Sequence, residues 1–128
     1  WVSIRILDEL RANPGEHSSH YIVDVQRSRY LETKYEYLCI SIARPNSPTP
    51  QNNVSVTLGI MIDATSRRRI KFIDHPDISS RDVNETCERC PLESCKERAA
   101  APIEVEKHAR QQAIESKLAA LKQEAASV

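Results

Sequence analysis

The most regular feature of the chain is an alternation of aliphatic residues with small or polar ones over positions 54–62. The aliphatic residues occupy every second position: Val54, Val56, Leu58, Ile60 and Ile62. Successive side chains of an extended chain point to opposite faces, so a period of two residues is typical of a strand with one apolar face. The pattern predicts a β-strand. Gly59 leaves the second face locally bare, either for close approach of a ligand or another backbone, or because the strand bulges there.

Further strands are predicted upstream at residues 21–25 and 35–43, because both stretches are rich in aromatic and β-branched side chains. The charged residues 27–34 between them predict a turn, and the three prolines within residues 45–53 predict a loop. A short strand is also predicted at residues 70–73.

The predicted strand at residues 35–43 has two unlike faces. Leu38, Ile40 and Ile42 form an apolar row, whereas the other face carries two tyrosines, a serine and Cys39. We therefore expect the apolar row to face the core. Cys39 is then expected beside the tyrosines, on the side opposite the aliphatic core.

The start of the chain shows helical spacing. Val2, Ile6 and Leu10 recur every four residues, and the Asn-Pro-Gly sequence at 13–15 cannot continue a helix. These features predict a helix over residues 1–12. Alternating apolar residues at its beginning leave a strand as the alternative.

From residue 99 onward the composition changes to Ala, Glu, Lys and Gln, and Pro102 suits the first turn of a helix. We predict a domain over residues 1–102 and an amphipathic helix over residues 103–128. Its apolar positions recur at intervals of four, three and four residues: Ile114, Leu118, Leu121 and Ala125. This narrow seam predicts a helix that packs on the domain or pairs with a second copy in a homodimer.

Charge and composition narrow the classes of function. Lys and Arg together number 18, as do Asp and Glu, so the chain has no overall positive field that would attract nucleic acid. It has neither an apolar run long enough to span a membrane nor a secretory leader, so we expect a soluble cytoplasmic protein. It has two glycines and lacks HExxH, GxSxG and P-loop motifs, so we do not expect an enzyme.

Three of the four cysteines lie within nine positions: Cys87, Cys90 and Cys95. Two residues separate the first pair and four separate the second, a spacing that lets sulfurs meet around one metal ion. A site made only of thiolates needs four of them, so we predict Cys39 as the fourth ligand. Basic residues near the segment, among them Arg98, can offset the negative charge of such a site.

Other interpretations of the cysteines stay open. Cys87 and Cys90 are also spaced as a redox pair or a disulfide, and Cys39 lies in an apolar run that suits an inert core residue. The metal is open too. Three clustered cysteines, one remote cysteine and Pro91 after Cys90 fit a 4Fe-4S cluster, with zinc as the alternative.

Taken together, these segments resemble the C-terminal domain of the short-chain fatty acyl regulator family, Xre-type transcription factors of bacteria. The resemblance covers most of the chain. It rests on a Trp-containing helix closed by Pro-Gly at residues 1–15, on Cys39 followed by Ala43-Arg44, on Leu58-Gly59, and on Cys87-x2-Cys90-x4-Cys95 followed by Arg98-Ala99 and Pro102.

The resemblance implies an α+β fold, a GAF-like or PAS-like antiparallel sheet flanked by helices, in which the four cysteines hold an iron–sulfur cluster. It implies short-chain acyl-coenzyme A as the ligand and a DNA-binding domain upstream of Trp1. A first residue other than Met agrees with a piece of a longer protein. We expect a ligand-sensing or redox-sensing regulatory domain; the alternative is a metal-stapled interaction module without a small ligand.

Overall fold

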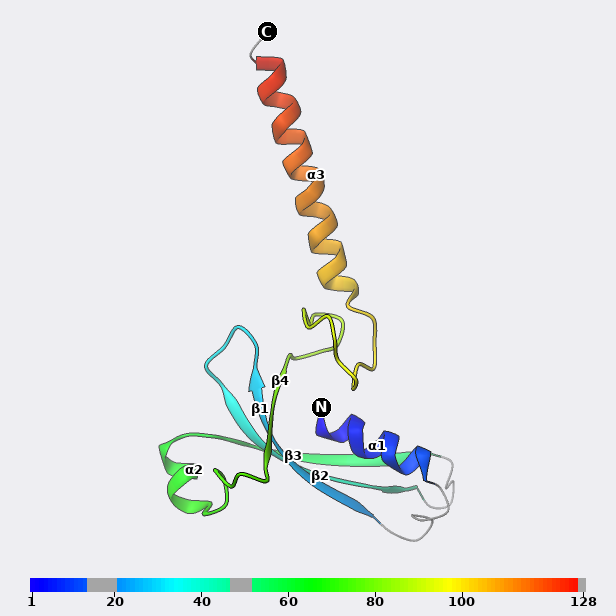
Figure 1. Ribbon diagram of the computed structural model, residues 1–128, viewed down its shortest axis with the longest axis vertical. Helices are drawn as coiled ribbons and strands as arrows, with labels where there is room; N and C mark the ends of the chain where they lie inside the picture. The colour runs from blue at the N-terminus through cyan, green and yellow to red at the C-terminus, as the bar shows by residue number, and fades with distance from the viewer. Residues whose placement is uncertain (14–20, 47–51, 127–128) are drawn as a thin grey trace. The chain divides into compact units, whose positions relative to one another are not determined.

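The computed structural model describes residues 1–13, 21–46 and 52–126. Its elements, in chain order, are α1 (Val2–Ala12), β1 (Ile22–Tyr30), β2 (Glu36–Pro45), β3 (Asn53–Met61), α2 (Ala64–Arg69), β4 (Ser79–Val83) and α3 (Ile103–Ala126) (Figure 1). Contacts within the chain divide it into two units, Trp1–Val83 and Asn84–Val128. We call them the sheet unit and the cysteine unit and describe each by itself.

The sheet unit contains a four-stranded sheet in the order β3-β2-β1-β4 (Figure 1). β2 pairs antiparallel with both β1 and β3, but β4 runs parallel to β1. The predicted α+β class is confirmed, with a mixed sheet flanked by helices. The expectation of a fully antiparallel sheet is wrong for β4, because that strand joins the sheet only after the chain has passed through β2, β3 and α2.

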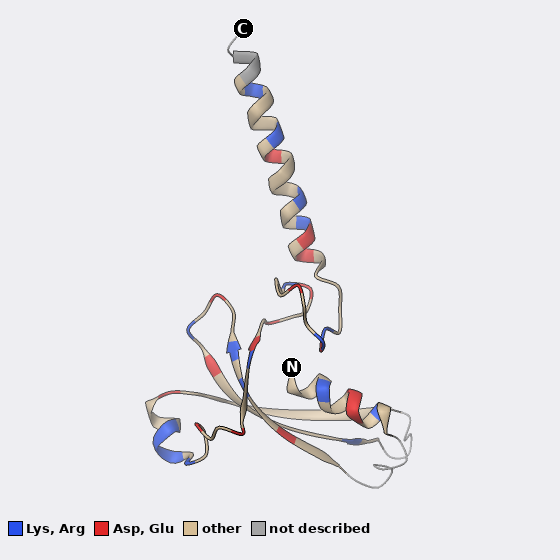
Figure 2. Ribbon diagram, in the orientation of Figure 1, with Lys and Arg blue, Asp and Glu red and all other residues tan. Residues whose placement is uncertain are grey.

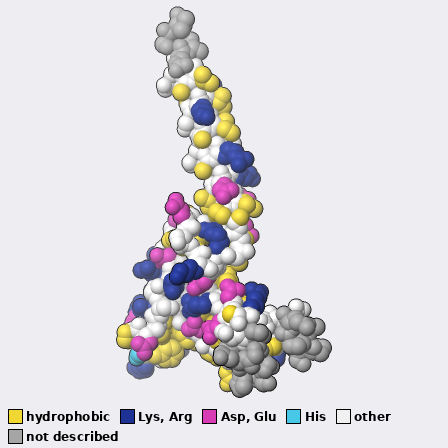
Figure 3. Space-filling model, turned by 45° about the vertical axis from the view of Figure 1, so that its right-hand side comes forward, with side chains coloured by type: hydrophobic (Ala, Val, Ile, Leu, Met, Phe, Trp, Pro, Cys, Tyr) yellow, Lys and Arg dark blue, Asp and Glu magenta, His cyan; other side chains and the backbone are white. Residues whose placement is uncertain are grey.

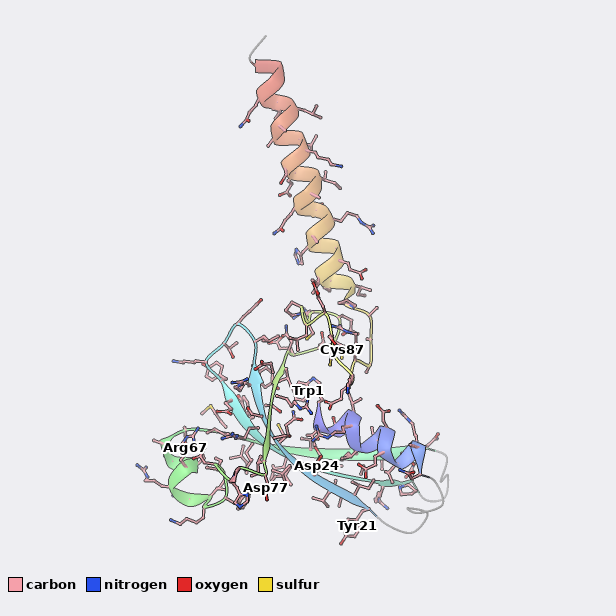
Figure 4. All side chains as sticks on the ribbon, viewed as in Figure 1. Trp1, Tyr21, Asp24, Arg67, Asp77 and Cys87 are labelled. Carbon is pink, nitrogen blue, oxygen red and sulfur yellow. The ribbon has the colours of Figure 1, made fainter. Side chains whose placement is uncertain are left out.

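Helix α1 packs on one face of the sheet and makes its hydrophobic core. Val2, Ile6 and Leu10, which share one side of the helix as their spacing predicted, pack with Cys39 and Ala43 of β2. Burying side chains of this size contributes about 1.5–3 kcal/mol each. Trp1, just before the helix, packs edge-on against Tyr30 of β1, with ring centroids 5.6 Å apart (Figure 4).

Strand β1 continues to Tyr30, although the charged residues 27–34 predicted a turn. The charges are compatible with a strand because each has a partner nearby. Arg29 Nε lies 2.9 Å from Asp82 Oδ1 of β4, and Arg27 Nη1 lies 3.3 Å from Asp74 Oδ1. The turn is confined to residues 31–34.

The segment after β3 differs most from expectation. Asp63 caps α2: its Oδ1 accepts the backbone N–H groups of Thr65 and Ser66 at 2.8 and 2.7 Å, while Ser66 Oγ accepts the Asp63 N–H. The bond from the Ser66 N–H is the main cause that lowers the pKa of the Asp63 carboxyl. The strand predicted at residues 70–73 is wrong, because that stretch is a turn that buries the side chain of Ile73.

Strand β4 was not predicted, because its sequence is mostly polar. Its residues, Ser-Ser-Arg-Asp-Val, lack an apolar alternation, so the backbone ladder to β1 holds the strand. The polar sequence at residues 16–20 also predicts a loop, and this stretch and most of the loop predicted at residues 45–53 lie outside the described residues.

Candidate metal centre

The cysteine segment lies in the cysteine unit, in the irregular stretch that precedes α3. Cys90 is buried, and Cys87 and Cys95 are half-buried. All four cysteines of the chain are free thiols, so the structure contains no Cys87–Cys90 disulfide. Cys87 is labelled in Figure 4.

The Arg98 guanidinium organises this loop. It donates through Nη1 to the Cys87 carbonyl at 2.9 Å and through Nη2 to the carbonyls of Cys90, at 3.4 Å, and Leu92. The Arg98 backbone N–H donates to the Cys95 carbonyl at 3.3 Å. The planar cation therefore gathers the backbone at Cys87, Cys90 and Leu92, for which its fixed fork of donors is well suited, and the backbone N–H of the same residue holds Cys95.

The sulfur of Cys87 has a hydrogen-bond donor of its own. The backbone N–H of Ala99 donates to Cys87 Sγ at 3.4 Å, and the N–H of Cys90 donates to the Cys87 carbonyl at 3.3 Å. The second bond closes a tight turn between the first two cysteines. Backbone N–H groups that point at sulfur are a common way in which proteins tune thiolate-ligated clusters.

Further bonds fix the outer part of the loop and join it to α3. The Asn84 side chain donates to the Arg89 carbonyl at 3.0 Å, and Arg89 pairs with Glu85 at 3.2 Å. The Glu104 N–H, in the first turn of α3, donates to the Glu88 carbonyl at 3.1 Å. The chain between the first two cysteines is thus attached directly to the start of the helix.

Cys39 belongs to the sheet unit and is buried in its core, with 3% of its surface exposed. It packs with Val2, Ile6 and Leu10 of α1, and Tyr37 packs against the same cluster. The expected neighbourhood of a tyrosine is confirmed. The expectation that Cys39 faces away from the aliphatic core is wrong, because α1 makes that core on the cysteine side of β2.

The side chains do not form a ready metal site. Among the residues that the structure describes, no three Cys, His, Asp or Glu side chains come close enough together to hold a metal ion. The chemistry of the loop nevertheless fits a metal, since it has three free thiols, a backbone gathered by Arg98 and an N–H directed at Cys87 Sγ. Binding would require the sulfurs to lie closer together than they do here. The four-cysteine centre stays a prediction.

Two other features of the sequence have simple structural roles. The three arginines at 67–69 lie on α2 and are exposed, and Arg67 pairs with Asp74 and, at 3.7 Å, with Glu36 (Figures 2 and 4). Gly59 pairs regularly with Cys39 in the sheet, so the strand does not bulge there. A Cβ added at Gly59 would lie 3.8 Å from Tyr37 Cδ1, an ordinary contact distance.

The sequence identified Arg98 only as a nearby positive charge. It did not predict that the Arg98 side chain donates hydrogen bonds to three backbone carbonyls. The fixed spacing of Arg98 from Cys95, with two residues between them, was the only available signal.

No family model, curated protein or solved structure matches the chain.

Proposed function

We propose that the chain is a regulatory domain whose cysteine loop holds a metal centre that senses a ligand or the redox state, in a bacterial transcriptional regulator. The proposed ligands are Cys87, Cys90, Cys95 and Cys39, around a 4Fe-4S cluster or, alternatively, zinc. The observation that carries the proposal is the Arg98 guanidinium, which gathers the backbone of the loop beside a sulfur that already accepts an N–H.

The residues of the loop would hold the centre in defined ways. Cys87 and Cys90 share one tight turn, and Cys95 is tied to Arg98 through its carbonyl. A bound cluster would supply sensitivity to oxidation, whereas zinc would supply only a fixed crosslink. Arg98 would also lower the electrostatic cost of gathering several thiolates, because its charge is of opposite sign.

The link from Glu104 to Glu88 suggests how the loop could report its state. Because the first turn of α3 is hydrogen-bonded to the chain between two of the proposed ligands, a change at the loop would alter the start of that helix. Short-chain acyl-coenzyme A remains the proposed small ligand, on the family resemblance alone. Contact with DNA is proposed only through a domain outside this chain.

A second candidate function, a metal-stapled interaction module without a small ligand, is favoured by the surface of α3. Its seam residues are exposed: 48% of Ile114, 51% of Leu118 and 61% of Leu121. Hydrophobic side chains are visible along the helix in Figure 3. A helix this polar gains most of its stability when such a seam is buried against another surface.

Among the described residues, no helix is both apolar and long enough to cross a membrane.

Purification without oxygen, followed by analysis of iron, sulfide and zinc and by a visible absorption spectrum, tests the metal centre. We expect one centre per chain, and the Cys87→Ser and Cys95→Ser variants should lose it. Protein that stays metal-free after reconstitution with iron and sulfide, and separately with zinc, would overturn the proposal.

Two variants separate the roles of the remaining residues. Cys39→Ala should release the metal if Cys39 is a ligand. If it is only a core residue, the variant should keep the metal and lose stability, because a buried side chain is truncated. Arg98→Lys keeps the charge but not the fork of donors, so it should weaken metal retention while the fold of the sheet unit is unchanged by circular dichroism.

A further inference from the structure

The strand register sorts the sheet residues into two faces, and the more aliphatic face is the one that α1 does not cover. Paired positions share a face, so Val23 lies beside Ile42, and Ile42 lies beside Val56. Following the register across β1, β2 and β3 collects nine aliphatic residues: Val23, Val25, Leu38, Ile40, Ile42, Val54, Val56, Leu58 and Ile60. We call this set the aliphatic face.

The segment from α2 to Asp74 covers one end of this face. Arg27 and Glu36 occupy that end, and they pair with Asp74 and Arg67 respectively. Leu38, next to them in the register, is fully buried without belonging to the core cluster under α1. Ile73, the neighbour of Asp74 in the chain, is also buried, with 2% of its surface exposed.

Beyond that end, five side chains of the face are exposed and the other three are half-buried. The exposed fractions of its side chains are 52% for Val23, 41% for Ile42, 37% for Val54, 69% for Val56 and 60% for Leu58. Together they present roughly several hundred Å² of contiguous apolar surface, as large as the largest patch on a typical monomer, which is often functional. The edge strand β3 adds to the exposure, since it contains neither a charge nor a proline that would discourage association.

We propose that two copies of the chain pack together through their aliphatic faces. A two-fold interface brings the same patch of each copy against the other, so the patch must be free of unpaired charge at its centre. This one is: its charged positions lie at the two ends, where Arg27, Arg29 and Glu36 are paired at one end and Arg44 marks the other.

The size and shape of the face favour a second copy over a small ligand. Burying the bare patch on both copies removes roughly 1,000 Å² of apolar surface, and a polar rim brings the total into the range of specific interfaces, about 1,200–2,000 Å². Two aliphatic sheet faces pack well at a spacing of about 10 Å. Small ligands bind in concave sites, whereas this surface is one face of a sheet. The interface does not depend on the metal.

The oligomeric state tests the proposal. We expect the chain to be a dimer by sedimentation equilibrium, and Leu58→Glu and Val56→Glu should each weaken the dimer about tenfold or more, because each places a charge among the most exposed apolar side chains of the face. Met61→Glu is the matched control. It lies on the same strand and is 44% exposed, but it pairs with Tyr37 on the other face, so it should leave the dimer intact.

Leu118→Glu, on α3, distinguishes the aliphatic face from the helix seam. A wild-type chain that is monomeric at all concentrations would overturn the proposal, as would dissociation caused by Leu118→Glu but not by Leu58→Glu. Circular dichroism checks that each variant is folded, which is expected because the substituted side chains are exposed. The Cys87→Ser variant should still dimerise, so failure of the metal proposal and failure of this one give different results.

Discussion

The face of the sheet under α1 carries Gln26, Ser28 and Ser41 in full burial, whereas the aliphatic face leaves Val56 and Leu58 more than half exposed. A single helix thus covers the more polar face of the sheet, and much of the more apolar face is exposed. Hydrophobic burial normally drives the opposite choice. The difference teaches that each face must be explained by its own partners: α1 for one and, as we propose, a second copy of the chain for the other.

The polar face tolerates burial because its groups satisfy one another. Arg5 of α1 donates to Asp24 at 2.6 Å and to Gln26 at 3.1 Å, and Gln26 donates to Ser28 Oγ at 3.0 Å. The hydroxyls of Ser41 and Thr57 share a hydrogen bond of 2.6 Å. A buried network of this kind costs little when every member has a partner, and it specifies how α1 sits on the sheet. On the aliphatic face, the ion pairs of the described residues lie at the end where Arg27 and Glu36 meet Asp74 and Arg67.

The largest effect is expected from truncating the core under α1. Ile6→Ala removes a fully buried side chain from the cluster and should cost about 2–5 kcal/mol in the free energy of unfolding. Urea denaturation measures it. The same substitution on the other face, Ile42→Ala, is the control, and in monomeric protein it should cost distinctly less because that side chain is 41% exposed. Equal costs would contradict the assignment of the two faces.

A smaller loss is expected when the polar network is broken. Gln26→Met keeps the volume of the side chain but removes its bonds to Arg5 and Ser28, so it should cost about 1–3 kcal/mol. The measurement is urea denaturation of Gln26→Met, Ser28→Ala and the double variant. Because the two residues are bonded, the two losses should not add. Strict additivity would show that the network contributes nothing as a unit.

A still smaller effect should appear in acid, at the covered end of the aliphatic face. The hydrogen bond from Arg67 holds the pKa of Asp74 below its ordinary value of 3.8. A lowered pKa in the folded state means that the ion pair contributes stability above that ordinary value and loses it as the pH falls through the folded one.

Asp74→Asn removes this contribution, so unfolding curves should show wild type more stable near neutral pH and the difference shrinking below about pH 4. Asp63, whose pKa is also lowered, stays in both proteins and cancels from the comparison. A difference that grows on acidification would mean that Asp74 does not act through its charge. Amide exchange at Ile73 and Leu38 gives an independent readout of whether the segment has loosened.

The smallest expected effect is a gain. Gly59→Ala should stabilise the sheet unit by about 0.4–1 kcal/mol, because alanine restricts the unfolded chain more than glycine does and the strand has room for a methyl group. Thermal unfolding measures it, with Thr57→Ala as a control on the same face that loses its bond to Ser41. A destabilised Gly59→Ala variant would mean that the contact with Tyr37 is tighter than 3.8 Å.

Local patterns located much of the sheet unit. The four-residue spacing of Val2, Ile6 and Leu10 placed α1, and strict alternation placed β3, because a helix or strand period leaves a direct imprint on the side chains that are buried or exposed. The spacing of the cysteines located the candidate centre but not its geometry, which depends on how Arg98 folds the loop. The sequence carries no pattern that predicts β4, since the place of this strand in the sheet depends on backbone hydrogen bonds that almost any sequence can make.

The sequence alone determined the period of α1, β2 and β3 and the sorting of their residues between two faces, because both follow from local backbone geometry. It could not decide which face α1 would cover. A row of apolar side chains can be buried within one chain or between two chains. A row of polar side chains can also be buried if its groups hydrogen-bond to one another. Only the tertiary structure, by placing Arg5 over Asp24 and Gln26, decided that the polar face lies inside and the aliphatic face outside.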